Sequence, residues 1–306
     1  MARSTRAKRI AGVSLTSANA DALAEFYTAL GFERAGIELR GGPAFAHLAR
    51  LPRAQARVVL LRLGAEWLEL AAFARPRRPY PDDGASNDPW FQHFAIVVSS
   101  MQAAYARLTR LNGWTPITRP QPQRLPASAG GATAFKFRDP EGHPLELLEF
   151  PADRMPPLWR ARGADEANPF LGIDHSAIVV ASTERSLDFY ERRLGLTRTG
   201  GSRNRGAEQA HLDGLPEPEV EVTALAAALP QPPHLELLCY RAPRAQAALS
   251  APLESCDIAA TRLMIEIGDP AGIEPALGAD DARLTALTGA LVHDPDGHAL
   301  VLVPRG

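Results

Sequence analysis

Short runs of branched and aromatic residues recur along this chain, and each is followed by a stretch whose apolar residues repeat every three or four positions. Residues 91–98 (FQHFAIVV) and 172–180 (GIDHSAIVV) are typical of strands, because β-branched and aromatic side chains suit a pleated sheet. The spacing predicts helices over residues 20–30, 101–111 and 183–194, each ending near a glycine. A strand followed by a helix is therefore the basic pattern.

The most informative stretch is 135–150, FKFRDPEGHPLELLEF, which predicts a strand, a tight turn and a second strand. Asp139, Pro140 and Gly142 suit the turn, since proline presets φ and glycine accepts a positive φ. Related sequences occur at 67–70 (WLEL), 234–237 (HLEL) and 293–303 (HDPDGHALVLV). A glutamate inside such an apolar strand needs a partner or a metal if it is buried.

These stretches divide the chain into four units of one strand, one helix and three strands. Their first strands, taken at Gly12, His93, His175 and Arg262, are 81, 82 and 87 residues apart, which indicates an internal repeat. Further strands are expected at 44–48, 58–63 and 67–72 in the first unit, and at 209–212, 219–224 and 234–240 in the third. In the fourth unit the helical part is short and interrupted by proline, and residues 121–131 predict a long loop that is a candidate lid.

Composition narrows the class of protein. A chain of 306 residues with 45% hydrophobic and 22% charged residues is typical of a globular protein with about two domains. The net charge of −2 gives no electrostatic reason to expect nucleic acid or a membrane surface as a partner. No apolar run is long enough to span a membrane, and the basic start lacks the apolar segment of a secretory signal. Two cysteines are too few for a disulfide framework, which favours a cytoplasmic location.

With these motifs the chain resembles the vicinal oxygen chelate superfamily, which includes glyoxalase I, extradiol dioxygenases and bleomycin-resistance proteins. The stretches that carry the resemblance are HSAIVVASTERSLDFYERRLGL (175–196), FQHFAIVV (91–98) and FRDPEGHPLELLEF (137–150). It implies an α+β fold in which four βαβββ modules pair into two curved, mixed-sheet, glyoxalase-like cups. It also suggests one domain at 1–150 (modules 10–73 and 91–150), a linker at 151–172 and a second domain at 173–306 (modules 173–242 and 259–304).

The resemblance also implies a metal site, held by a residue near the start of each first strand and a glutamate on each last strand. Carried over to this chain, the ligands are His93 and Glu146 from module two, and His175 and Glu236 from module three. Imidazole and carboxylate ligands suit a divalent Zn, Ni, Fe or Mn ion and leave positions open for a substrate.

Modules one and four lack complete ligand pairs. Gly12 replaces the first-strand ligand of module one and leaves Glu69 alone, while module four has Arg262 and Val301 at the two positions. The full set of two histidines and two glutamates therefore exists only if modules two and three share a cup. Pairing in chain order would instead separate a cup holding Glu69, His93 and Glu146 from a cup holding His175 and Glu236.

The function implied is that of a metal-dependent lyase or isomerase similar to glyoxalase I. It would act on a small-molecule substrate with vicinal oxygens through an enediolate-type intermediate, with Glu146 or Glu236 as general base. The alternatives are a dioxygenase of the extradiol type and a non-catalytic ligand-binding protein similar to bleomycin-resistance proteins. The superfamily resemblance also allows a homodimer.

Overall fold

The structure is a computed structural model that describes residues 7–163, 168–244, 252–268 and 289–304. The first module contains β1 (Ala7–Thr16), α1 (Ala20–Ala29), β2 (Glu33–Arg40), α2 (Gly42–Leu48), β3 (Ala56–Leu63) and β4 (Glu66–Phe73). The second contains β5 (Gln92–Val98), α3 (Met101–Leu108), β6 (Thr115–Pro116), β7 (Gln123–Arg124), a 3₁₀ turn (Ala127–Ala129), β8 (Thr133–Arg138) and β9 (Pro144–Glu149).

After the short helix α4 (Pro157–Ala161), the third module contains β10 (Phe170–Val179), α5 (Thr183–Leu187), a π-helical turn (Asp188–Arg193), β11 (Thr197–Arg205), α6 (Ala207–Asp213), β12 (Glu219–Ala226) and β13 (His234–Ala242). The fourth has β14 (Thr261–Ile267), β15 (Ala290–His293) and β16 (Ala299–Pro304). The helical part expected in this module falls on residues 269–288, outside the described residues. Among the described residues, no helix is long and apolar enough to cross a bilayer.

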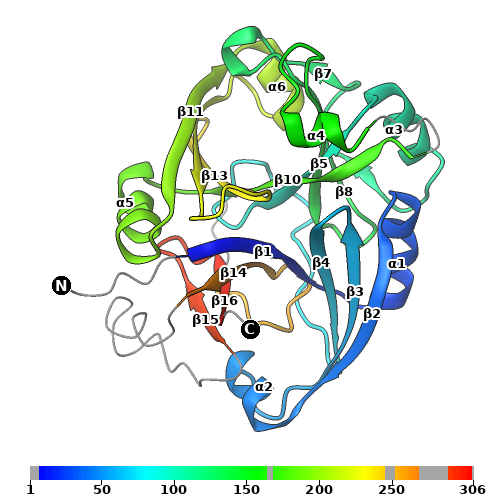
Figure 1. Cartoon of the computed structure of the whole chain (residues 1–306), viewed down its shortest axis with the longest axis vertical. Coiled ribbons are helices and arrows are strands. Elements are labelled where there is room, and N and C mark those ends of the chain that lie inside the picture. Colours follow the sequence, from blue (N-terminus) through cyan, green and yellow to red (C-terminus); the bar gives the residue numbers. More distant parts are fainter. Residues whose placement is uncertain (1–6, 164–167, 245–251, 269–288, 305–306) are drawn as a thin grey trace.

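The modules pair into two mixed sheets, as Figure 1 shows. One sheet has the order β11-β12-β13-β10-β5-β9-β8-β6, with β7 also paired to β8, and joins modules two and three. The other has the order β15-β16-β14-β1-β4-β3-β2 and joins modules one and four. The expected α+β fold of four modules in two curved mixed sheets is confirmed.

The pairing of modules is central rather than sequential. At the middle of one sheet β5 lies antiparallel to β10, and at the middle of the other β1 lies antiparallel to β14. Each half of the chain, 1–150 and 173–306, therefore gives strands to both sheets. The division into two domains at these boundaries stays a prediction, but the sheets themselves are made between the halves and not within them.

Two of the expected strands are helices. Residues 44–48 lie in α2 and residues 209–212 lie in α6, while the second strand of each module is β2 or β11 instead. Both β2 and β11 are sheet edges that are largely exposed, so they lack the apolar alternation that marks a strand. Gly41 and Pro43 favour the start of α2, because proline is compatible with the first turn of a helix.

The repeated turn sequences fasten the two sheets together. The ring of His143, in the turn between β8 and β9, contacts Asp139 Oδ2 at 2.8 Å and the Thr16 carbonyl of the other sheet at 2.9 Å. The hydroxyl of Tyr27 on α1 donates to the same Asp139 oxygen at 2.8 Å. His298 and its neighbours repeat the arrangement, with Nε2 2.7 Å from the Val179 carbonyl. These turn histidines therefore have a structural role.

Candidate metal centre

The sheet register alone brings four predicted ligands to one face. Glu146 on β9 lies opposite Ala95 on β5, which lies opposite His175 on β10. Residues two apart on a strand share a face of the sheet. His93, two residues before Ala95 on β5, therefore points to the same face of the sheet as Ala95, Glu146 and His175.

The second half of the site repeats this arrangement about the centre of the sheet. Ala177, two residues after His175, lies opposite His93 on one side and opposite Glu236 on the other. The two histidines and two glutamates are thus related by an approximate twofold symmetry between modules two and three.

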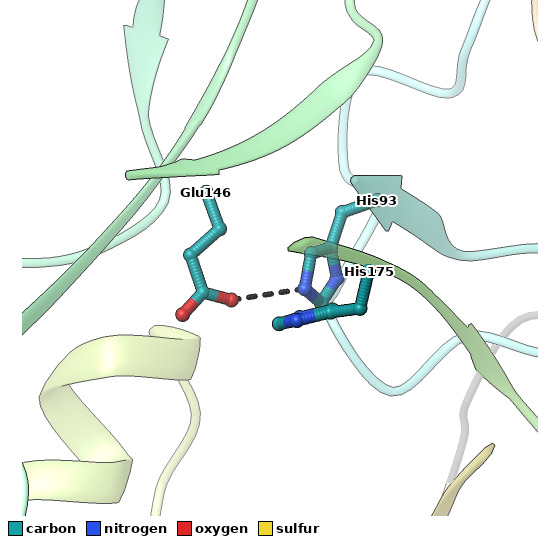
Figure 2. A group of neighbouring side chains, drawn as sticks. All are labelled: His93, Glu146 and His175. Atoms are coloured by element: carbon teal, nitrogen blue, oxygen red, sulfur yellow. Dashed lines mark ion pairs between the residues drawn. The ribbon is translucent and has the colours of Figure 1, made fainter. Parts of the chain in front are cut away.

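Three of the four side chains form a tight group. The ligand atoms of His93, Glu146 and His175 all lie within 4.8 Å of one another, and Figure 2 shows the three side chains pointing toward a common point. Two ligand atoms on opposite sides of one ion would be about 4.2 Å apart, twice a metal–nitrogen bond of about 2.1 Å. Small side-chain movements would therefore complete a coordination shell.

The ring of His93 carries the clearest sign of a missing partner. Its Nε2 lies 2.9 Å from Oε2 of Glu146, whereas Nδ1 has no hydrogen-bond partner among the described residues. The side chain is only 2% exposed, and burial, with the nearby ammonium of Lys136, lowers the pKa of His93. A buried neutral imidazole with an unpartnered nitrogen is costly unless something binds it, and a metal ion would do so. The donor set therefore fits a divalent metal.

His175 is held in a fixed orientation. Its Nδ1 lies 3.0 Å from Oδ2 of Asp174, which leaves Nε2 facing the carboxylate of Glu236 at 3.7 Å. The other oxygen of Asp174 accepts a bond of 3.1 Å from the indole of Trp159 on α4. Carboxylates that orient a ligating histidine in this way are a common support of metal sites. Helix α4, in the predicted linker 151–172, is therefore packed against the site.

The carboxylates around His175 decide its charge. Burial alone would lower the pKa of His175, but Glu236 and Asp174 outweigh this effect and raise it to about 9. Burial would raise the pKa of Glu236, but His175 and His234 lower it to about 2. The metal-free site at neutral pH thus holds a protonated His175 beside ionised glutamates, and a metal ion would take the place of that proton.

A buried cation borders the site opposite Glu146. Lys136 on β8 pairs with Glu146 in the sheet register, and its Nζ lies 2.7 Å from Oδ1 of Asp213 at the end of α6. Burial alone would lower the pKa of Lys136, but the carboxylate of Asp213 raises it. Asp213 also accepts from Gln209 and Tyr240, so the ion pair is part of a larger network between modules two and three.

A cavity of about 490 Å³ opens from these residues. All four predicted ligands line it, together with Lys136, Asp174 and His234. Leu125, Ala129 and Gly130 of the loop over residues 121–131 also line it, so the loop lies where a lid would have to be. The volume suits a small organic substrate.

Comparison with known proteins agrees with this architecture. The family model described as "Glyoxalase/Bleomycin resistance protein/Dioxygenase superfamily" matches residues 9–147 and 172–302, which is most of the chain. The chain belongs to this superfamily. A search of curated proteins gave no match.

Solved structures of the superfamily share the fold of the whole chain. Glyoxalase I from Zea mays matches at a TM-score of 0.59 and a mutant of that enzyme at 0.62, each with 15% identity over 97% of this chain and 92% of the other. A putative dioxygenase from Bacillus subtilis matches at a TM-score of 0.56 with 12% identity, over 97% of this chain and 86% of the other. At these identities the likeness shows the superfamily fold and no particular reaction.

Several residues of the site were not predicted from the sequence. His234 lies two residues before Glu236 on the same strand and therefore on the same face, and its Nε2 is 3.5 Å from that carboxylate. Lys136 lies between two core phenylalanines, so strand alternation places it on the cup face. These two were recoverable from strand parity, and Asp174 from its position next to His175. Nothing in the sequence marks Asp213 as a partner of Lys136.

The second cup is the one formed by the seven-stranded sheet of modules one and four. Among the described residues, it has no comparable group of metal-ligating side chains. Glu69 is engaged with Arg40, at 2.7 and 2.9 Å, and His93 lies in the other sheet. The alternative grouping of Glu69, His93 and Glu146 is therefore wrong, because sequential modules do not share a sheet. His47 on α2 and His211 on α6 are exposed.

Proposed function

We propose that the chain is a metal-dependent lyase or isomerase similar to glyoxalase I, acting on a small substrate with two adjacent oxygens. The observation that carries the proposal is the convergence of His93, Glu146 and His175, whose ligand atoms lie within 4.8 Å of one another, with Nδ1 of the buried His93 unpartnered among the described residues. Glu236, which faces Nε2 of His175, is proposed as the fourth ligand. A divalent ion held there would act as a Lewis acid on adjacent oxygens of the substrate.

The protein's own groups would position the substrate and move its proton. Glu236 is the better placed general base, because its side chain is 23% exposed while that of Glu146 is 8% exposed and lies against His93. A carboxylate oxygen of Glu236 would take a proton from the substrate carbon next to the oxygens. His234, 3.5 Å away and partly exposed, would pass that proton toward solvent.

The metal is tested by comparing two single histidine variants. Protein purified without chelators should contain one divalent ion per chain by mass spectrometry, and His175→Ala should lose it. His211→Ala, which removes an exposed imidazole on α6, should retain it. Absence of stoichiometric metal from the unsubstituted protein would contradict the proposal, and ligand binding indifferent to EDTA would favour the binding-protein alternative.

The reaction class is tested by proton exchange. In D₂O the metal-loaded protein should exchange the C–H proton of 2-hydroxycarbonyl compounds, followed by NMR. Glu236→Gln should slow exchange by about 100-fold or more, the contribution expected of a general base. Bound iron with oxygen consumption and no exchange would favour the dioxygenase instead.

A further inference from the structure

The second cup contains a cavity of its own. A cavity of about 420 Å³ lies against the seven-stranded sheet and is lined in part by residues of α2. Figure 1 shows this sheet and α2 in its lower half. Its walls are largely apolar and include Phe45, Leu48, Val58, Phe73, Met264 and Val301. The charged residues that line it are Arg40, Glu69 and Arg262. The cavity is therefore apolar, with charge at a few positions only.

The sheet register shows that Arg262 stands where the other cup has a histidine. Ser14 on β1 lies opposite both Glu69 and Arg262, as Ala95 lies opposite both Glu146 and His175. Glu69 is thus the counterpart of Glu146, and Arg262 the counterpart of His175.

The remaining two positions carry no donor. Met264 lies opposite both Gly12 and Val301, as Ala177 lies opposite His93 and Glu236 in the first cup. Gly12 and Val301 therefore stand in place of a histidine and a glutamate. The second cup therefore holds a positively charged side chain, Arg262, where the first cup has the predicted ligands of a metal cation.

The guanidinium of Arg262 is buried and donates its hydrogen bonds to neutral groups. The side chain is 5% exposed, and its guanidinium donates to the Ser255 carbonyl at 3.1 Å, Ser14 Oγ at 3.3 Å and Thr16 Oγ1 at 2.8 Å. It forms no ion pair in the part of the chain that the structure describes. Burial lowers the pKa of Arg262 to about 10, so the group is still charged at neutral pH.

The carboxylate that lines the cavity, Glu69, bonds to Arg40 and not to Arg262. Both terminal nitrogens of Arg40 bond to its two oxygens, at 2.9 and 2.7 Å. The charge of Glu69 partly offsets the lowering of the pKa of Arg262 but gives it no ion pair, and a buried charge without a bonded counter-ion is costly unless an anion binds it. Three of the five guanidinium N–H donors of Arg262 are used by described residues, which leaves two for a ligand.

We infer that the second cup binds a small organic carboxylate, with the anionic group on Arg262 and an apolar tail against the cavity walls. The two free donors are one on Nε and one on Nη1, and charge-assisted hydrogen bonds from a guanidinium favour a carboxylate over a neutral polar ligand. The apolar walls select for a hydrocarbon body. This site does not depend on the metal centre, which lies in the other sheet.

Octanoate and its neutral counterpart octanamide test the inference by isothermal titration calorimetry on the full chain. Octanoate should bind with one-to-one stoichiometry, and octanamide about tenfold or more weakly, since a charged hydrogen-bond partner is lost. Arg262→Met should weaken octanoate binding about tenfold or more. Arg57→Met, which removes an exposed arginine that pairs with Asp21, should leave it unchanged.

A second variant covers the case in which Arg262→Met does not fold. Val301→Phe keeps the arginine but fills part of the cavity, and it should also abolish octanoate binding. Equal binding of octanoate and octanamide, absence of octanoate binding, or full binding by both cavity variants would overturn the inference. Binding lost in His175→Ala or after metal removal would place the anion at the metal centre and would equally overturn it.

Discussion

The proton on His175 should make metal binding depend on pH. Because the carboxylates of Glu236 and Asp174 raise the pKa of His175 to about 9, a metal ion at neutral pH must displace one proton. His93, whose pKa burial lowers, has no proton to release near neutrality. The apparent affinity should therefore rise about tenfold per pH unit and level off near pH 9, a difference of about 100-fold between pH 7 and the plateau.

Replacing Asp174 tests the cause of this dependence. Asp174→Asn keeps an oxygen that can accept from Nδ1 of His175 but removes the negative charge. The pKa of His175 should then fall, because one of the two carboxylates that raise it is gone, and the plateau should begin about one pH unit lower. The pH at which affinity levels off is the informative quantity, since loss of the supporting carboxylate also weakens binding itself.

Competition with a fluorescent chelator for Zn²⁺ or Ni²⁺ across the neutral to alkaline range would give the affinities. Calorimetry in buffers of different ionisation enthalpy would count the protons released. Asp153→Asn, at an exposed position, serves as the control and should match the unsubstituted protein. Affinity that is constant between about pH 7 and 9, or binding without proton release, would refute the reasoning.

Three further substitutions test buried polar contacts, two of them around the site and one between the sheets. Lys136→Met should lower the free energy of unfolding by about 3–5 kcal/mol, because it leaves the carboxylate of Asp213 buried without its ion-pair partner. Denaturant unfolding measures this difference, and a change below about 1 kcal/mol would contradict the prediction. Tyr27→Phe removes one hydrogen bond to Asp139 at the contact between the sheets and should lower the free energy of unfolding by about 1.5–3 kcal/mol. The melting temperature should fall, and an unchanged melting temperature would argue against a stabilising role for this bond. Trp159→Phe should weaken metal binding about tenfold without removing a ligand, because it removes the indole hydrogen bond to Asp174. Unaltered metal affinity would show that α4 does not support the site.

Much of the fold follows from strand patterns, but the pairing of modules does not. The repeat spacing and the Leu-Glu-Leu strands predict four similar units, and the donor set itself favours bringing His93 and His175 together. Edge strands were harder to predict, because β2 and β11 expose both polar and apolar residues and carry no period. The helices α2 and α6 contain apolar runs short enough to resemble strands.

The site residues likewise divide into those that repeated strand motifs predict and those that they do not. His93, Glu146, His175 and Glu236 come from repeated motifs, and the structure brings them to one cavity, although their role as ligands stays a prediction. Asp213 was missed because its contact with Lys136 joins two modules through α6, a helix that sequence patterns assigned as a strand. Contacts made by irregular or misassigned segments carry no periodic signal.

The order in which strands meet has a consequence for synthesis. All strands of the sheet that carries the candidate metal centre are made once Ala242 has been added, so this sheet can close while the chain is still growing. In the other sheet β1 can pair on one side with β4 of the same module, but its other side pairs with β14, which is made much later. A ribosome-bound chain should thus complete the sheet of the candidate metal centre first, while one side of β1 stays without its partner strand until β14 has been made.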